Sequence, residues 1–168
     1  MTKSIYKFLF FFVSILCFLN SCNDTVNPPQ PLPPEMSANF SGYDSLKFES
    51  QVLITKNNLG DRLQLGLSGY MDSKQIGMVI SIFYLDSILK AGTFNIVSSS
   101  QGINYDYAMA ALYIGKGDNQ KTFYADSGTV IITQIKGLTI NGSFKFFATE
   151  LNGDSQLIVD NGVLAINW

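Results

Sequence analysis

Apolar residues recur at every second position in several stretches of the chain. The clearest is RLQLGLS, residues 62–68, in which leucines alternate with small or polar residues. Because successive side chains of a strand point to opposite faces, this period of two indicates a strand with one buried face. Similar apolar and aromatic patterns predict further strands over residues 48–55, 76–85, 93–97, 105–114, 122–124, 129–135, 138–149 and 156–166.

Short runs of Asn, Gly, Asp and Ser separate these stretches, and residues of these types favour turns. Residues 36–168 contain no proline, which suits strands whose backbone N–H groups are used in a ladder. We therefore expect a single all-β domain over 36–168. It would be an antiparallel meander of about eight or nine strands that closes into a sandwich or a flattened barrel.

A glycine precedes two apolar residues in four similar stretches: GTFNI, GTVII, GSFKF and GVLAI, which begin at Gly92, Gly128, Gly142 and Gly162. A phosphate-binding glycine loop would need clustered glycines before a helix, and none of the four has that setting. We interpret them as strand openings whose apolar pairs face the core. The predicted inward pairs are Phe94 with Ile96, Val130 with Ile132, Phe144 with Phe146, and Leu164 with Ile166.

The first residues have the order of a secretory signal. Lys3 and Lys7 precede an apolar run over residues 8–19, and small or polar residues follow it. As a helix this run would rise about 18 Å, which is short of the roughly 30 Å needed to span a bilayer. We expect residues 1–21 to form a signal helix that is removed on export.

The sequence LNSC, which ends at Cys22, resembles the lipobox of bacterial lipoproteins. The resemblance implies cleavage before Cys22 and attachment of acyl chains to its thiol. The other cysteine, Cys17, falls within the signal, so the mature chain would contain no disulfide. Residues 22–35 would form the lipidated end and a linker that contains all five prolines of the chain. Such a segment favours an extended polyproline II spacer.

Histidine is absent and the formal net charge is only −2. Without histidine there is no Ser-His-Asp triad and no imidazole metal ligand. No basic cluster suits a phosphate backbone, so we expect no nucleic-acid partner. Glu150 with Asp154 or Asp160 would be the candidate carboxylate pair of a glycosidase-like site, but both aspartates lie in turn-like sequences, where solvated residues are expected. We expect a protein that is not an enzyme and has no cofactor or metal.

Three tyrosines, Tyr105, Tyr107 and Tyr113, fall at odd positions of one predicted strand and would share a face, with Tyr124 nearby in sequence. If exposed, this face would suit sugar rings or a protein partner. If buried, it belongs to the core. A third possibility is a barrel cavity for an apolar ligand, in which Phe94, Phe144 and Phe146 line a void instead of filling it.

The lipobox, the proline-rich linker and the stretches MSANFSGYDSLKF, AGTFNI and SGTVIITQIKGLTINGSFKFFATELNGDSQLIVDNGVLAI together resemble small lipoproteins of Bacteroidetes-type bacteria. Their β-rich domain has no assigned function, so the resemblance implies fold and location only.

These observations lead to one functional expectation. The chain would be tethered to the cell envelope through acyl chains on Cys22, and it would act as a binding or accessory module. Asn23 follows the cysteine, where an aspartate would resemble an inner-membrane retention signal, so we expect the outer membrane. The partner would be a glycan or an envelope protein.

Overall fold

The structure, a computed structural model, describes residues 35–42, 46–98, 103–137 and 139–167. The predicted signal helix and almost all of the proline-rich linker, including Cys22, lie outside these ranges. Pro33–Trp168 forms one compact unit. The described residues contain ten strands and two short 3₁₀ turns, η1 (Asp72–Lys74) and η2 (Gly117–Asn119). The strands are β1 (Met36–Ser41), β2 (Leu46–Ser50), β3 (Val52–Asn58), β4 (Leu63–Met71), β5 (Ile76–Tyr84), β6 (Gly92–Val97), β7 (Tyr107–Ile114), β8 (Lys121–Lys136), β9 (Thr139–Glu150) and β10 (Gln156–Asn167).

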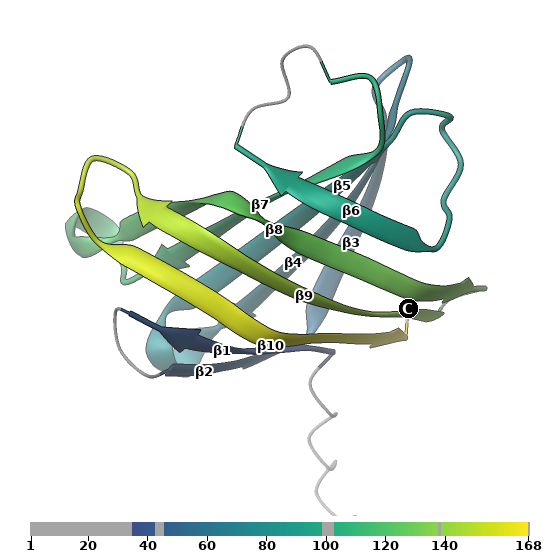
Figure 1. The fold of residues 1–168 in the computed structure, drawn as a ribbon. Coiled ribbons are helices and arrows are strands. Elements are labelled where there is room, and N and C mark those ends of the chain that lie inside the picture. Colours follow the sequence, from purple (N-terminus) through teal and green to yellow (C-terminus); the bar gives the residue numbers. More distant parts are fainter. Residues whose placement is uncertain (1–34, 43–45, 99–102, 138, 168) are drawn as a thin grey trace, which may run out of the picture. The chain divides into compact units, whose positions relative to one another are not determined.

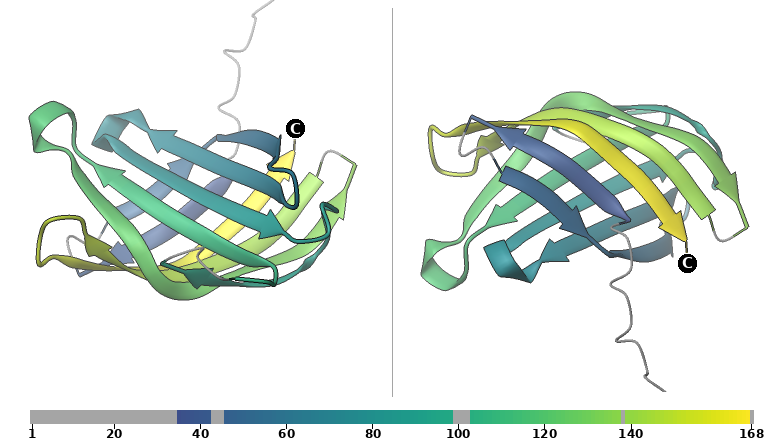
Figure 2. Two further views of the ribbon diagram at one scale, coloured as in Figure 1. Left: turned by 90° about the horizontal axis from the view of Figure 1, so that it is seen from above. Right: turned by 90° about the horizontal axis from the view of Figure 1, so that it is seen from below.

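The strands form one sheet in the order β2-β1-β10-β9-β8-β6-β7-β5-β4-β3, with an additional pairing between β8 and β7. Neighbouring strands are antiparallel except at a single parallel pair, Ile96 with Ala108, between β6 and β7. The sheet curls until it is nearly closed, as the two views in Figure 2 show. The predicted all-β class is confirmed, and the nearly closed sheet agrees with the predicted sandwich or flattened barrel. The parallel pairing of β6 with β7 makes the sheet mixed, so it is not a simple antiparallel meander.

The two halves of the flattened barrel cross each other in Figure 1, and the chain passes from one half to the other within β8 and between β2 and β3. The first part of β8 pairs with β7, and the part after a bulge at Asp126 pairs with β6. On the other side, β2 pairs with β1 and the next strand, β3, pairs with β4, with only Gln51 between them. Strands that pass from one half to the other at a bulge or bend are typical of orthogonally packed sheets.

The strands β2 and β4 meet without a backbone ladder, and we call this place the seam. The side chain of Ser50 on β2 joins the two strands by hydrogen bonds. The Ser50 hydroxyl accepts a hydrogen bond from the Tyr70 N–H at 2.8 Å, and its own hydrogen points to Gln51 O at 2.6 Å or Tyr70 O at 3.0 Å. Among the described residues, Ser50 is the one buried residue with a polar aliphatic side chain. Its bonds replace the ladder that β2 and β4 do not form.

The inward faces of the strands fill the barrel with one apolar cluster. The four predicted inward pairs are all buried in it, which confirms the period-two interpretation. Burying such side chains contributes about 1.5–3 kcal/mol each, so the core can stabilise the domain without a disulfide. Phe144 and Phe146 stack with ring centroids 6.2 Å apart, and the Phe94 ring meets Tyr84 edge-on at 5.2 Å.

The predicted position of the glycine frames is wrong for three of the four. Gly92 begins β6, whereas Gly128, Gly142 and Gly162 lie inside β8, β9 and β10. Gly162 lies directly opposite Phe144. A Cβ at Gly162 would be 2.5 Å from both the Cδ2 and the carbonyl oxygen of Phe144. This glycine therefore makes room for an inward aromatic ring.

The chain enters the domain at Glu35. Its carboxylate accepts hydrogen bonds from the Val52 N–H at 2.9 Å and from the Asn167 N–H at 3.2 Å. Its backbone N–H donates to Ser50 O, and its carbonyl accepts from the Ala165 N–H. One residue thus joins the start of β1 to β2, β3 and the end of β10.

Candidate binding face

The side chains on the outward side of β4, β5 and β7 are all uncharged. Antiparallel register places them in rows across the three strands. The rows are Tyr70, Gly77 and Tyr113; Ser68, Val79 and Ala111; Gly66, Ser81 and Met109; and Gln64, Phe83 and Tyr107. None of these residues is charged. We call this surface the uncharged face.

Two neighbouring strands extend the uncharged face without adding charge. On one side, β3 places Leu53, Thr55 and Asn57 beside Ser68, Gly66 and Gln64. On the other side, β8 places Thr122 and Tyr124 beside Tyr113 and Ala111. Leu53, Tyr70 and Tyr124 are all largely exposed. The surface therefore presents aromatic, apolar and neutral polar groups to solvent.

Tyr70 and Tyr113 converge on Gly77. A Cβ placed on Gly77 would be 3.5 Å from Tyr70 Cδ2 and 3.6 Å from Tyr113 Cδ2. Gly77 is buried although it occupies an outward position of β5. Tyr70 is 54% exposed and Tyr113 is half-buried. The two rings therefore cover the glycine and remain accessible themselves. We call this pair the tyrosine platform.

Of the three tyrosines expected to share a face, Tyr107 and Tyr113 both lie on the outward side of β7, but they differ in exposure, and Tyr105 lies before the strand. Tyr105 is 50% exposed but precedes β7, and Tyr113 belongs to the tyrosine platform. Tyr107 points to the outer side yet is only 3% exposed. Its ring stacks on Phe83 with centroids 4.7 Å apart, and the guanidinium carbon of Arg62 lies 5.3 Å from the Tyr107 centroid. Tyr107 is thus covered, and the face is centred elsewhere.

Arg62 ties a loop to this end of the sheet. Its Nη2 donates a hydrogen bond to the carbonyl oxygen of Ile103, and its Nε lies 3.8 Å from the Asp61 carboxylate. Its Nη1 is buried and has no hydrogen-bond partner among the described residues. The guanidinium is engaged with Tyr107 and Ile103, so it does not place a free cation on the uncharged face.

Neutral side chains on the face are linked to one another. Asn57 Nδ2 donates to Gln64 Oε1 at 3.3 Å, and Gln64 Nε2 donates to Ser81 Oγ at 3.1 Å. Amides carry both donors and acceptors, so each group keeps capacity for a further hydrogen bond. An open groove at the rim, lined by Ser50, Gln51, Val52, Leu53, Ser68, Gly69 and Tyr70, borders the same surface.

The sequence pattern does not single out Tyr70 as a candidate binding residue. The alternation in residues 62–68 continues to Tyr70 and already places it on the outer side of the strand. What the sequence does not contain is the register that sets Tyr70 and Tyr113 on either side of Gly77. The outward position of Tyr70 can therefore be predicted from its own strand, but its position near Tyr113 depends on how the strands pair.

The three carboxylates of the candidate catalytic pairs, Glu150, Asp154 and Asp160, have different surroundings. Glu150 Oε2 lies 3.1 Å from Lys121 Nζ. A hydrogen bond from Ser155 and the contact with Lys121 lower the pKa of Glu150 below its usual value. Asp154 is exposed in the turn after β9, and Asp160 lies at the bulge of β10. A carboxyl held ionised in this way suits a structural ion pair better than proton donation.

Within the described ranges, no three or more His, Cys, Asp or Glu side chains gather as they would around a metal ion. The same ranges hold no helix with the length and hydropathy needed to cross a bilayer. Comparisons with protein-family models, curated proteins and solved structures give no match for the chain.

Proposed function

We propose that the chain is a lipid-anchored protein of the cell envelope whose β domain is a non-catalytic binding module. The observation that carries this proposal is the uncharged face, in which the tyrosine platform stays exposed on an ordered sheet. Contiguous exposed aromatic and apolar surface on a soluble domain commonly marks an interaction site. A rigid sheet positions such a surface better than a loop does.

The proposed anchor is Cys22. The lysines, apolar run and LNSC sequence before it support export and acylation, and two or more acyl chains would hold the protein durably on a membrane. The proline-rich segment up to Glu35 would act as a spacer of about 3.1 Å per residue where it adopts polyproline II. Asn23 after the cysteine favours the outer membrane.

An apolar ligand inside the barrel is the less favoured alternative. The rings of Phe94, Phe144 and Phe146 are buried in the core cluster and contact other side chains there. This packing supports a binding site on the outside of the sheet. The absence of histidine and the ion-paired state of Glu150 support a role without catalysis.

Hydrogen exchange measured by mass spectrometry tests the binding face even while the ligand is unidentified. The acylated protein in mild detergent would be incubated separately with the polysaccharide, protein and lipid fractions of the envelope. We expect at least one fraction to slow exchange in β4, β5 and β7, because a bound ligand restricts opening of these strands. Slowed exchange confined to the surface of β9 and β10, or no change with any fraction, would contradict the proposal.

A further inference from the structure

The uncharged face has features that select among ligand classes. Its rings are held in place by backbone pairing and by their contacts over Gly77, and its polar groups are neutral amides and hydroxyls. We propose that this face binds an uncharged glycan chain, with sugar rings stacked on Tyr70 and Tyr113. This inference rests on the proposed binding function and names its ligand class.

The spacing of the tyrosine platform suits an extended chain. β4 and β7 are separated by one strand, so their backbones are about 9.5 Å apart at two strand spacings. Tyr70 and Tyr113 both lean toward Gly77 from opposite sides. The two rings therefore lie on either side of Gly77 on the outer face of three adjacent strands. Tyrosine offers a flat apolar ring with a hydroxyl at low entropic cost, and both parts match a sugar ring.

Neutral polar groups that match sugar hydroxyls lie on the same face, six residues along β4 from Tyr70, which is about 20 Å at the strand rise of about 3.4 Å per residue. Asn57, Gln64 and Ser81 form a hydrogen-bonded line across β3, β4 and β5. Amide groups both donate and accept, and a sugar hydroxyl does the same. A chain that lies on the tyrosine platform and continues along the sheet would pass over these groups and over the small side chains of Ser68 and Ala111.

The other candidate occupants fit less well. An acidic glycan or an anionic lipid headgroup would call for exposed lysine or arginine, and the face has neither. A protein partner is usually held by bulky anchors that enter pockets and by a charged or polar rim. Here the middle rows of the face consist of Ser68, Val79 and Ala111 and of Gly66, Ser81 and Met109, so they contain no aromatic or charged side chain of the kind that usually anchors a protein partner.

The competing explanation is that Tyr70 and Tyr113 cover Gly77 only to stabilise the sheet. Aromatic side chains that lie over a glycine of the neighbouring strand stabilise a sheet without any ligand. In that case removal of either ring would lower the melting temperature and change no binding. The experiment therefore measures both stability and binding.

The experiment is affinity electrophoresis of the acylated protein in detergent gels that contain a neutral polysaccharide. Dextran, a mixed-linkage β-glucan, xyloglucan and mannan serve as neutral probes, and alginate serves as the acidic probe. We expect at least one neutral polysaccharide to retard the protein and alginate to have no effect. Tyr70→Ala and Tyr113→Ala should each raise the dissociation constant obtained from the retardation about tenfold, because each variant loses a surface on which a sugar ring stacks.

Tyr105→Ala is the matched control, because Tyr105 is as exposed as Tyr70 but lies off the face. It should be retarded as the unmodified protein is. Ser68→Arg keeps both rings and places a bulky side chain between them and the amides, so it should also weaken retardation while the melting temperature stays near that of the unmodified protein. Tyr70→Phe keeps the ring and should retain binding.

Three results would overturn the glycan inference: retardation by alginate alone, no retardation by any neutral probe, or an equal loss in Tyr105→Ala and Tyr70→Ala. If exchange in β4, β5 and β7 is then slowed by the protein or lipid fraction, the binding face stands and only its ligand class is wrong. If no fraction slows exchange there, the binding function itself fails.

Discussion

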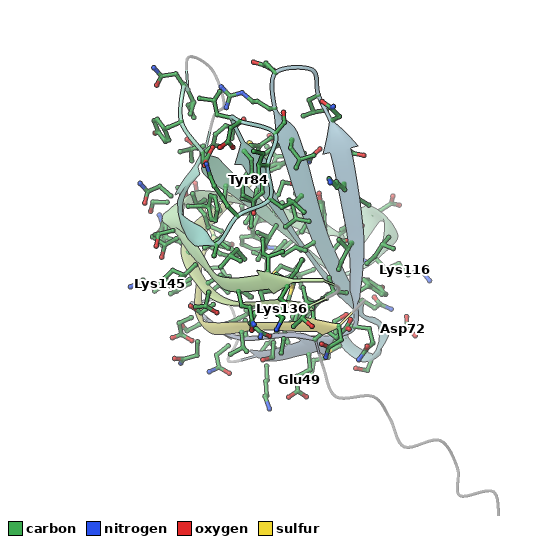
Figure 3. The ribbon with its side chains drawn as sticks, turned by 90° about the vertical axis from the view of Figure 1, so that its right-hand side faces the viewer. Glu49, Asp72, Tyr84, Lys116, Lys136 and Lys145 are labelled. Atoms are coloured by element: carbon green, nitrogen blue, oxygen red, sulfur yellow. The ribbon has the colours of Figure 1, made fainter. Side chains whose placement is uncertain are left out.

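The hydroxyl of Tyr84 is a polar group inside an apolar barrel. The side chain is fully buried, and its oxygen has no hydrogen-bond partner among the described residues. Figure 3 shows it within the domain, whereas the labelled Lys145 and Lys116 lie at the periphery. Burial, and secondarily the negative charge of Asp106, raises the pKa of Tyr84 far above its usual value of 10.0. Burial of the Tyr84 ring therefore stabilises the folded state, whereas burial of its unpaired hydroxyl destabilises it.

Tyr84→Phe should therefore raise the free energy of unfolding by about 1 kcal/mol at pH 7, because it removes an unsatisfied buried donor. The pH dependence has a definite sign. Above about pH 10 the unfolded chain loses the tyrosine proton while the folded chain keeps it, so the unmodified protein loses stability as pH rises. Tyr84→Phe should lose less.

Chemical denaturation at pH 7 and at about pH 10.5, just above the ordinary tyrosine pKa, measures both effects. Tyr124→Phe is the control, since Tyr124 is exposed and should change neither value. A variant at Tyr84 that is less stable than the parent at pH 7 would mean that the hydroxyl is hydrogen-bonded in solution.

The glycine frames give a second prediction at this scale. Gly162→Ala should cost about 2 kcal/mol or more, because its Cβ would meet the backbone and ring of Phe144 at 2.5 Å. Gly92→Ala is the matched control. Its Cβ would have only ordinary contacts with Phe94, from 3.5 Å, so its melting temperature should stay near that of the parent. Equal melting temperatures for the two variants would contradict the close approach at Gly162.

Individual side chains are predictable from the sequence where the period of two holds and poorly predictable where a bulge interrupts it. The four inward pairs are buried as expected. Near Gly128 and Gly162 the alternation changes phase, which resembles the start of a new strand. In β10, Leu157 and Val159 face inward at odd positions and Leu164 and Ile166 at even ones, with a bulge between Val159 and Gly162. The sequence shows that the inward positions change from odd to even numbers, but it does not show whether a bulge or the start of a new strand causes the change.

At the scale of elements, the same ambiguity explains the strand count. The sequence predicts two strands over residues 122–124 and 129–135, yet both belong to β8, whose phase changes at the bulge near Asp126. It predicts one strand over residues 48–55, which instead contain the bend at Gln51 between β2 and β3. β1 is missed because its alternation of Met36, Ala38 and Phe40 with polar residues is short and directly follows prolines.

The seam gives the prediction that belongs to this scale. Ser50→Ala should lower the free energy of unfolding by about 1–3 kcal/mol, because the Tyr70 N–H loses its hydroxyl acceptor and the link from β2 to β4 is lost. Hydrogen exchange would show the loss as faster exchange at the end of β4. Ser37→Ala, on an outward position of β1, is the control and should have little effect. An unchanged exchange rate at Tyr70 in Ser50→Ala would contradict the role of the seam.

At the scale of the whole molecule, the sequence predicts the class of fold but not the candidate site. The tyrosine platform combines residues from β4, β5 and β7, and the pairing of β5 with β7 passes over β6 in chain order. No local pattern encodes that register. Tyr107 shows the converse limit: its outward position is predictable, but its cover by Arg62 and Phe83 comes from other parts of the chain.

The proposed anchor is tested on the intact chain in its envelope. Cys22→Ala should abolish incorporation of a labelled fatty acid and move the protein from the membrane to the soluble fraction, because acyl chains contribute about 0.8 kcal/mol per buried methylene. Cys17→Ala is the control and should leave labelling intact, since Cys17 precedes the expected cleavage point. Undiminished labelling in Cys22→Ala would contradict a lipid at that residue.

The place of β1 in the sheet has a mechanical consequence. The chain enters at Glu35, and β1 lies between β2 and β10, paired to both. Tension on the chain ahead of Glu35, directed along β1, would load both ladders in shear, so their hydrogen bonds would have to break together. A strand at the sheet edge, pulled in the same direction, would load one ladder instead of two. The domain is thus built to resist pulling at the point where its own chain would transmit a force.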